Sequence, residues 1–300
     1  MNAKPLLSAV HKRKRKRPTI WSVLIYIVMT SFAFACLFPL IYEFLLSVSS
    51  QDDFLKAKFL VWPSEFNIEM YKLILFQDRI GKAFFISTML TVIGLIYAMS
   101  LNVLGAYVLS KRDLPGRNIF FTMLLITMFF SGGLIPFYLT LRSLHLTNNY
   151  IGLILPFGGG AFNMILLRNF FAQVPSDVID SCKMDGASDF RVLWQFILPL
   201  SKAGLATISL FTMVGKWNDW YWPMILLIDD DKFPLALELR NVLSAARGDQ
   251  VEGGVIDMDV VYAQGKNAAM IIVSLLPIIV VYPFLQKYFV KGVMIGAVKS

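Results

Sequence analysis

Long apolar stretches recur along the chain, and they constrain its fold more than any other feature. Each reaches or exceeds the roughly 20 residues that a helix needs to cross a hydrocarbon core about 30 Å thick. Only 16% of the residues are charged, whereas a soluble domain has about 25%. We therefore predict an all-α membrane protein with six transmembrane helices, at residues 20–46, 83–110, 118–141, 150–171, 202–228 and 267–290.

The distribution of charge predicts how these helices are oriented. Seven of the 28 Lys and Arg residues precede Thr19, and a short basic turn lies at residues 111–117. Cytoplasmic loops carry an excess of Lys and Arg. Both termini, the basic turn and the polar stretch at residues 174–200 are therefore predicted to be cytoplasmic. Residues 229–266, rich in Asp and Glu, are predicted to form a long loop outside.

The order of these features suggests four segments. They are a basic cytoplasmic head, the first helix with an outer loop, a core of five helices that contains the polar stretch, and a cytoplasmic tail, at residues 1–19, 20–82, 83–290 and 291–300.

The first apolar stretch has an alternative interpretation. A basic segment before an apolar run also marks a cleaved signal peptide, and Ala33-Phe34-Ala35-Cys36 resembles a lipoprotein cleavage site. The apolar run, however, continues to residue 46, well beyond the about 7–15 residues of a signal core. We therefore predict an uncleaved first helix.

Gly and Pro interrupt two of the predicted helices. The third contains residues 131–133 (Ser-Gly-Gly) and Pro136, and the fourth contains Pro156 and three glycines at residues 158–160. Lipid cannot hydrogen-bond the backbone groups that such breaks free. The breaks are therefore predicted to face protein or water.

The polar stretch at residues 174–200 predicts two short helices. In its first half Val178, Ser181 and Cys182 recur at helical spacing, and Gly186 follows where a left-handed C-cap is expected. Ser188 can cap a second helix, which Pro199 helps to end. The second helix would carry an apolar stripe of Phe190, Leu193, Trp194 and Ile197. An ordinary amphipathic hairpin is the alternative, but a loop of this length inside a membrane protein is seldom an idle connector.

The same stretch resembles the cytoplasmic coupling loop of the membrane subunits of binding-protein-dependent ABC importers. That loop has the pattern Glu-Ala-Ala, three residues, Gly, nine residues, Ile, any residue, Leu-Pro. Asp180-Ser181-Cys182 stands at the triplet, Gly186 at the glycine, Phe196 at the isoleucine and Leu198-Pro199 at the end. The triplet and Phe196 depart from the pattern. The resemblance implies contact with an ATPase through Asp180, Ser181, Cys182, Asp185, Gly186, Ala187, Leu198 and Pro199.

Other segments resemble a subgroup that carries oligosaccharides, aldouronates and polysaccharide fragments. They are residues 109–112, 115–117, 130–136, 167–171 and 286–292. The resemblance implies the type I ABC importer permease fold and a pathway shared with a second permease subunit. It also implies a cytoplasmic ABC ATPase dimer that uses ATP and Mg²⁺, and an extracytoplasmic solute-binding protein. A permease for a solute other than a carbohydrate is the alternative.

No stretch of the sequence points to catalysis by this chain. Gly81-Lys82 and Gly215-Lys216 lack the glycine spacing and the following hydroxyl of a phosphate-binding loop, so ATP would be hydrolysed by another polypeptide. With two Cys and two His far apart, no metal or cofactor site is expected. A membrane-embedded enzyme would need a nucleophile or acid–base motif that is absent from the sequence, and a passive channel would leave the polar stretch without a role.

A second cluster combines aromatic and charged residues near the end of the fifth helix. We name Trp217, Asn218, Asp219, Trp220 and Tyr221 as candidate pathway residues. Lys216 and Asp219 are three residues apart and can pair, while the aromatic rings could stack on sugars from one face. The alternative is an aromatic belt, because Trp217 lies ~22 Å along a helix from Lys202, near the outer interface.

Overall fold

The computed structural model describes the chain except for residues 1–19, 51–52, 54–61, 78, 250–257 and 298–300. The described residues form helices and connecting loops, with no strand among them. Along the first half of the chain these helices are α1 (Ile20–Ser47), α3 (Glu69–Lys72), the π-helix η1 (Leu73–Gln77), α4 (Ile80–Ser110), α5 (Arg117–Phe129), α6 (Leu134–Ser143), α7 (Tyr150–Ile154), the 3₁₀ turn η2 (Leu155–Phe157) and α8 (Ala161–Phe171). The second half has α9 (Ser176–Met184), α10 (Asp189–Val192), the π-helix η3 (Leu193–Ile197), α11 (Leu198–Leu200), α12 (Lys202–Trp217), α13 (Tyr221–Leu226), the 3₁₀ turn η4 (Asp230–Lys232), α14 (Leu235–Asp249) and α15 (Met258–Ala297).

Three helices are long and apolar enough to cross a membrane without a break. They are α1, α4 and the part of α15 at Gln264–Phe284. Three further spans are possible if each of three bent helix pairs counts as one, with bends of 108° between α5 and α6, 46° between α7 and α8, and 84° before α12. The all-α membrane fold is confirmed, and the α5–α6 and α7–α8 pairs break where Gly and Pro predicted.

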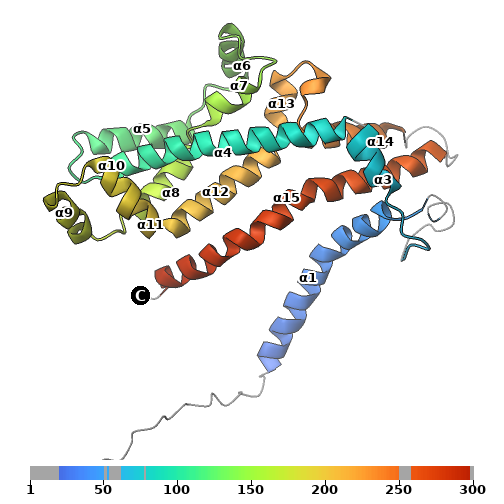
Figure 1. The fold of residues 1–300 in the computed structure, drawn as a ribbon, viewed down its shortest axis with the longest axis horizontal. Coiled ribbons are helices and arrows are strands. Elements are labelled where there is room, and N and C mark those ends of the chain that lie inside the picture. The colour runs from blue at the N-terminus through green and yellow to red at the C-terminus, as the bar shows by residue number, and fades with distance from the viewer. Residues whose placement is uncertain (1–19, 51–52, 54–61, 78, 250–257, 298–300) are drawn as a thin grey trace, which may run out of the picture.

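Helix α1 exposes large apolar side chains along its length. Trp21 and Ile25 near its start and Phe32 at its middle are 72%, 60% and 67% exposed. The helix leans away from the bundle and meets α15 (Figure 1). A helix that is apolar all round and packed on one side only is suited to lipid rather than to water.

The break between α5 and α6 leaves backbone uncovered. Residues 130–133 are exposed, and the N–H groups of residues 131–133 donate no hydrogen bond to another described residue. Gly132 has no neighbouring atom within 4 Å of the position that a Cβ would take. The face of the third predicted span is therefore open at this point.

The predicted outer loop at residues 229–266 is wrong in part. Helix α14 occupies Leu235–Asp249, and α15 begins at Met258, nine residues before the predicted start of the sixth span. Leu235 and Leu237 are each 1% exposed and pack on the bundle, while the charged residues Glu238 and Arg240 are half-buried. The acidic composition hid a helical period that buries one face. The fifth predicted span is likewise not continuous, since α12 ends at Trp217 and α13 begins at Tyr221.

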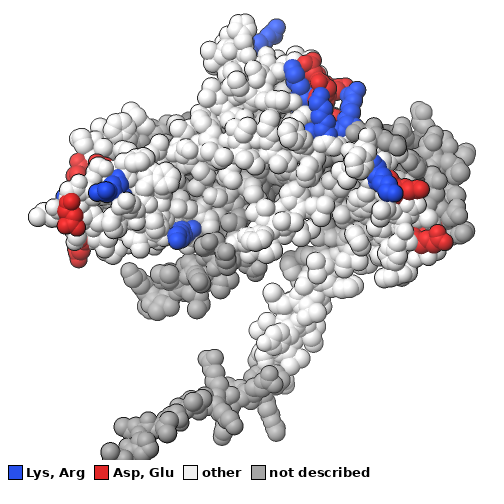
Figure 2. All heavy atoms as spheres, viewed as in Figure 1, with Lys and Arg blue, Asp and Glu red and all other residues white. Residues whose placement is uncertain are grey.

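The connections gather at two opposite ends of the bundle. At one end, on the left in Figure 1, the turn after α4 meets the α9–α11 segment, and Lys111 Nζ lies 2.6 Å from Asp189 Oδ2. At the other end Arg79 and Lys82 lie 3.5 and 2.9 Å from Asp230 and Asp231. Figure 2 shows that charged side chains gather toward the two ends of the visible face, with a largely uncharged surface between them. This grouping is the one that the predicted topology requires. That the first end is cytoplasmic stays a prediction.

Candidate functional site

The stretch at residues 174–200 folds as the two predicted helices with a left-handed turn between them. Gly186 has φ +80°, its N–H donates to the Lys183 carbonyl (3.0 Å), and the Ala187 N–H donates to the Cys182 carbonyl (3.0 Å). This pair of bonds is a Schellman motif, which satisfies the last carbonyls of α9. Ser188 Oγ accepts the Arg191 N–H at 3.4 Å and caps α10, as predicted.

Pro199 shapes the end of the second helix through a π-turn. Residues 193–197 form the π-helix η3, which is followed by one α-turn, and the helical run ends at Leu200. Proline has no N–H to donate, and its ring clashes with the carbonyl four residues earlier in a regular α-helix. A π-turn accommodates an extra residue in the ladder. The chain then bends by 84° into α12.

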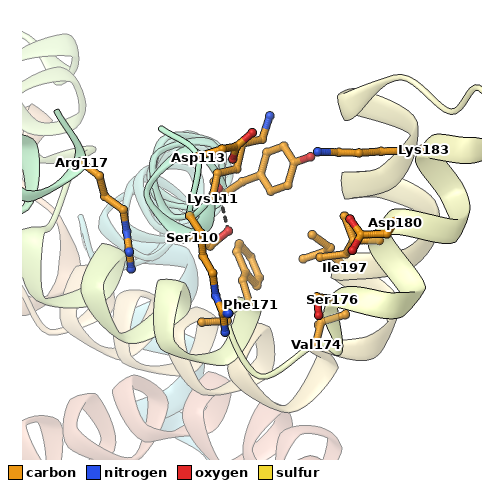
Figure 3. A pocket seen from close by; sticks show the side chains of 14 residues that line it. Ser110, Lys111, Asp113, Arg117, Phe171, Val174, Ser176, Asp180, Lys183 and Ile197 are labelled. Carbon is orange, nitrogen blue, oxygen red and sulfur yellow. Dashed lines mark hydrogen bonds between the residues drawn. The ribbon is translucent and has the colours of Figure 1, made fainter. Parts of the chain in front are cut away.

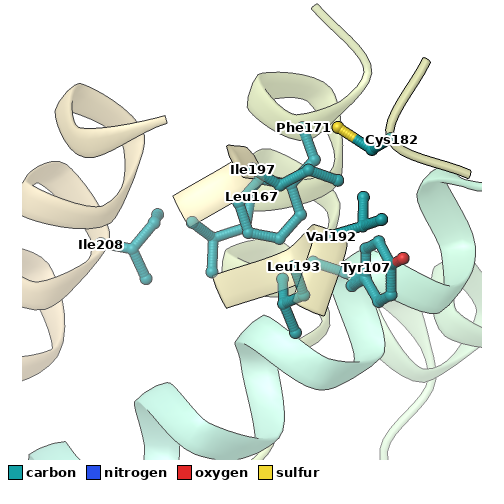
Figure 4. Packing of buried hydrophobic residues seen from close by; sticks show 9 residues of the cluster. Tyr107, Leu167, Phe171, Cys182, Val192, Leu193, Ile197 and Ile208 are labelled. Atoms are coloured by element: carbon teal, nitrogen blue, oxygen red, sulfur yellow. The ribbon is translucent and has the colours of Figure 1, made fainter. Parts of the chain in front are cut away.

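An apolar core fixes the inner face of this stretch to the bundle. Cys182 is 7% exposed, and Val192, Leu193 and Ile197 are 0–2% exposed. They pack against residues of α4, α8 and α12, namely Tyr107, Leu167, Phe171 and Ile208 (Figure 4). We call this set the coupling core. Because three membrane helices contribute to it, the α9–α11 segment cannot shift without moving them.

The predicted apolar stripe is only half right. Leu193 and Ile197 are buried as expected, but Phe190 and Trp194 are 65% and 58% exposed. Val192 takes an inward position instead. The π-turn at residues 193–197 rotates the residues before it relative to those after it, which an α-helical period cannot anticipate. Phe190 and Trp194 lie with ring centroids 6.0 Å apart, and Met184 at the end of α9 is 88% exposed.

Polar contacts fasten the second helix to the end of α4. Lys111 Nζ lies 2.6 Å from Asp189 Oδ2 and 4.9 Å from the centroid of the Tyr107 ring. The Tyr107 hydroxyl donates to the Asp189 carbonyl at 3.1 Å and lies 3.3 Å from its Oδ1. The hydrogen bond from Lys111 lowers the pKa of the Asp189 carboxyl. Sequence reasoning missed Asp189, although an acidic residue after a helix cap and opposite a basic turn was a usable signal.

A cavity of 500 Å³ separates the α4–α5 turn from α9 (Figure 3). Basic side chains line it on both sides, Lys111, Arg112 and Arg117 from the turn and Lys183 from α9. Asp180 lies on the α9 wall and is exposed. The remaining predicted coupling residues differ in environment: Ser181, Asp185, Gly186 and Pro199 are exposed, whereas Ala187 and Leu198 are half-buried against the coupling core. The Ser181 hydroxyl donates to the Asp177 carbonyl of its own helix at 2.7 Å.

The second predicted cluster does not share one face. Trp217 is 6% exposed, its Nε1 donates to the Ser274 carbonyl at 2.9 Å, and its ring meets Phe84 edge-on at 5.5 Å. It is a core residue that joins α12 to α4 and α15, which corrects the prediction that its ring lies beside those of Trp220 and Tyr221. The latter two are 37% and 39% exposed.

Lys216 and Asp219 also depart from the predicted pair. The Lys216 ammonium donates to the Leu153 carbonyl at 3.2 Å and lies 5.2 Å from the centroid of the Phe157 ring. Asp219 Oδ1 accepts the Trp222 N–H at 3.3 Å, in the break between α12 and α13. Asn218 continues the backbone of this break and is exposed. Each charged group thus hydrogen-bonds a backbone group near a helix break, and the two do not form an ion pair within 4 Å.

The break between α7 and α8 is satisfied by protein groups. Asn102 of α4 is 1% exposed; its Nδ2 donates to the Gly158 carbonyl (3.5 Å), and its Oδ1 accepts the Gly160 N–H (3.1 Å). A Cβ on Gly158 would overlap the Tyr97 ring, so any larger residue there would force that ring to move. The prediction that this break faces protein or water is confirmed, and at Gly158 and Gly160 the partner is protein. Asn102 was missed, although an amide inside an apolar span is a recognised signal of function.

A polar cavity of 190 Å³ lies beside this break. We call it the polar break, and its lining includes Asn102, Asn163, Thr212, Lys216 and Asp219. Asn163 Nδ2 lies 3.4 Å from Thr212 Oγ1. Hydrogen-bonding side chains from three helices therefore meet in a region that is otherwise apolar, an arrangement that can pass or hold a hydroxyl-rich solute.

Comparisons with known proteins agree on one family. Residues 103–295 match the model of the binding-protein-dependent transport system inner membrane component. The polygalacturonan/rhamnogalacturonan transport system permease protein YtcP of Bacillus subtilis (strain 168) is 38% identical over 284 residues, which is 94% of this chain and 99% of that protein. The arabinooligosaccharides transport system permease protein AraQ of the same strain is 29% identical over 225 residues, 73% of this chain and 74% of that protein.

A solved structure shows the same likeness in three dimensions. The crystal structure of a bacterial ABC transporter involved in the import of the acidic polysaccharide alginate contains a chain of the same fold, with TM-score 0.80 and 31% identity. The match covers 95% of this chain and 100% of that one.

Proposed function

The chain belongs to the family of binding-protein-dependent transport system inner membrane components, and from this premise we propose that it forms half of the pathway of an ATP-driven importer for an oligosaccharide or polysaccharide fragment. It is a multi-pass protein of the bacterial plasma membrane and not an enzyme. The cargo is proposed because the relatives carry polygalacturonan or rhamnogalacturonan, arabinooligosaccharides and alginate.

One observation carries the proposed mechanism: the α9–α11 segment has an outer apolar face and an inner face buried in the bundle. Met184, Phe190 and Trp194 are 88%, 65% and 58% exposed. Exposed aromatic and Met side chains at the end of a rigid element are typical anchors of a protein interface. We propose that they dock on a cytoplasmic ATPase that hydrolyses ATP with Mg²⁺, and that Asp180 adds an ionic contact at its edge.

The same three helices contribute to both the coupling core and the polar break. Helix α4 carries Tyr107 and Asn102, α8 carries Leu167 and Asn163, and α12 carries Ile208 and Lys216. A displacement of the coupling segment by the ATPase would therefore reach the polar break through rigid helices and not through loops. In this proposal the polar break belongs to the translocation pathway, and Asp219 is the member of the predicted aromatic cluster that lines it.

Two further partners complete the proposed assembly. A second permease subunit would cover the open α5–α6 break and the other side of the pathway, since lipid cannot satisfy backbone groups exposed at residues 130–133. A solute-binding protein would deliver the cargo at the end that carries Arg79, Lys82 and α14. The family description implies a binding protein.

The docking proposal is tested by removing the two exposed rings. Phe190→Ala combined with Trp194→Ala should leave the chain inserted, because neither ring packs in the coupling core. The affinity for the ATPase should fall by about 30-fold, since two interface anchors of about 1 kcal/mol each together contribute about 2 kcal/mol. Phe76→Ala is the matched control, an 86% exposed ring at the opposite end. Wild-type retention of the ATPase by the double variant would contradict the docking assignment.

A further inference from the structure

A cavity at the outer end combines an aromatic ring with a guanidinium group. It has a volume of 440 Å³ and lies between α13 and α14, lined by Trp220, Ala236, Leu239, Arg240, Leu243 and Ser244. Cavities of about 300–1,000 Å³ are the usual size of small-molecule sites. We call this the α13–α14 cavity.

The walls of the α13–α14 cavity are held by the bundle. The inward face of α14 is buried at Leu235 and Leu237, each 1% exposed. The Leu235 N–H donates to Ser87 Oγ of α4 at 2.8 Å. Trp220 stands in the short break that joins α12 to α13. A site on such elements keeps its geometry better than one on a free loop.

The charge of Arg240 has no acidic partner among the described residues. Its guanidinium carbon lies 4.1 Å from the centroid of the Trp220 ring, and its Nη1 lies 2.7 Å from Met224 Sδ. A thioether is a weak acceptor and an indole ring offers only its π face. By contrast, the cations Arg79, Lys82 and Lys232 at this end lie 3.5, 2.9 and 2.8 Å from aspartates. Apart from this contact of Nη1 with Met224, the guanidinium donors of Arg240 bond to no other described residue, so they can bind an anion at the cavity.

The linings of the α13–α14 cavity and the polar break include two residues that are consecutive in the chain. Asp219 lines the polar break, and Trp220 lines the α13–α14 cavity. Both belong to the short connection between α12 and α13. The α12–α13 connection thus contributes side chains to both cavities.

We propose that the α13–α14 cavity is an outer subsite for a sugar residue that carries a carboxylate, so that the cargo is a uronate-containing glycan. The guanidinium would bind the carboxylate through two parallel N–H donors. Trp220, Leu239 and Leu243 would cover the apolar face of the sugar ring. This inference rests on the proposed carbohydrate import and adds the charge of the cargo to it.

The test compares one oligosaccharide in two charge states. The complete importer, with its wild-type binding protein, is reconstituted in vesicles, and uptake of trigalacturonate is compared with uptake of its methyl ester. Arg240→Gln should raise the half-saturating concentration for trigalacturonate by about tenfold or more, as expected for the loss of a charge-assisted pair. It should leave the value for the neutral ester within about twofold of wild type. Since the binding protein is unchanged, the shift between variants isolates the contribution of this chain.

Further variants separate recognition from structure. Arg240→Lys keeps the charge but not the planar fork, and its shift should be intermediate. Arg142→Gln is the matched control, an exposed arginine in the last turn of α6, and it should not change the preference. Direct binding of labelled trigalacturonate to the permease pair without the binding protein should weaken in Arg240→Gln alone.

Three results would overturn the inference. If Arg240→Gln leaves the ratio of half-saturating concentrations for trigalacturonate and its methyl ester unchanged, the cavity does not bind the carboxylate. If uptake of both oligosaccharides falls equally and the importer no longer assembles, Arg240 and Trp220 have a structural role at the membrane interface. If Arg240→Gln still prefers trigalacturonate over its ester, but its uptake no longer depends on anionic lipid in the vesicles, the guanidinium binds a lipid headgroup instead. If the wild-type importer takes up no oligosaccharide of either kind, the proposed function fails and this inference falls with it.

Discussion

The turn at Gly186 offers a graded test of the coupling assignment, because its cost can be worked from the backbone alone. Gly186 has φ +80°, and no heavy atom lies within 4 Å of the position of an added Cβ. A substitution there meets no steric contact, so its cost is that of holding an L-residue in the left-handed region. That cost is roughly 1–2 kcal/mol for Ala, which lowers the fraction of correctly turned loops by about 5- to 30-fold.

The order of four residues at this position follows from the same argument. Asn tolerates the left-handed region better than Ala, and a β-branched residue tolerates it least. We expect ATPase copurification and substrate uptake to fall in the order Gly, Gly186→Asn, Gly186→Ala, Gly186→Val. Membrane insertion should be unchanged, because the turn lies outside the helices that cross the membrane.

The assay is pull-down of the ATPase with a tagged permease, combined with uptake in the same cells. Gly215→Ala is the matched control for ATPase retention, since its added Cβ also meets open space but its φ lies outside the left-handed region. Normal retention and uptake in Gly186→Val would refute the coupling assignment. A larger loss in Gly186→Asn than in Gly186→Ala would refute the backbone argument itself.

Four other substitutions or pairs give further expectations. Asp180→Ala should reduce ATPase copurification less than Gly186→Val does, because an exposed ion pair contributes about 0–1 kcal/mol; a larger loss than in Gly186→Val would contradict this. The contact of Asp189 with Lys111 lowers the pKa of the Asp189 carboxyl, so its stabilisation is present above the pKa of the unfolded state and is lost as pH falls through the folded pKa; thermal unfolding of Asp189→Asn should therefore depend less on pH in the acidic range than that of wild type. Trp217→Ala should lower stability by about 3–5 kcal/mol and lose assembly and transport together, as measured by detergent-solubilised yield and melting temperature; intact assembly would contradict its place in the core. Without Cys36 and Cys182, an impermeant thiol reagent on intact cells should label Asp231→Cys but not Ser188→Cys, and the reverse would overturn the predicted topology.

Features set by neighbours in the sequence could be predicted. The Gly186 turn and the Ser188 cap depend on bonds that reach no more than five residues, from Cys182 to Ala187 and from Ser188 to Arg191. The apolar spans depend on composition over about 20 residues. Both kinds of signal lie within a short window, which is why the two loop helices and the breaks in the third and fourth spans were found.

Features set by distant partners were missed. Trp217 is in the core because Ser274, 57 residues later, accepts its N–H. Asp189 is held by Tyr107, 82 residues earlier, and Asn102 is defined by a break 56 and 58 residues away. Phe190 and Trp194 are exposed because a π-turn changes the helical register. A local pattern can mark Asp189 or Asn102 as unusual, but it cannot name their partners, since these contacts exist only once the helices have packed.

The open break at residues 130–133 has a consequence for how much of this chain a cell keeps. Its backbone N–H groups need a partner that neither lipid nor the described part of this chain supplies, and each unmet group in hydrocarbon costs several kcal/mol. In the proposed assembly a second permease chain closes the break, and a lone copy is less stable without it. We expect membrane proteases to clear copies made in excess, so that the ratio of the two permease chains is set after synthesis, by mutual protection, and not by their rates of translation.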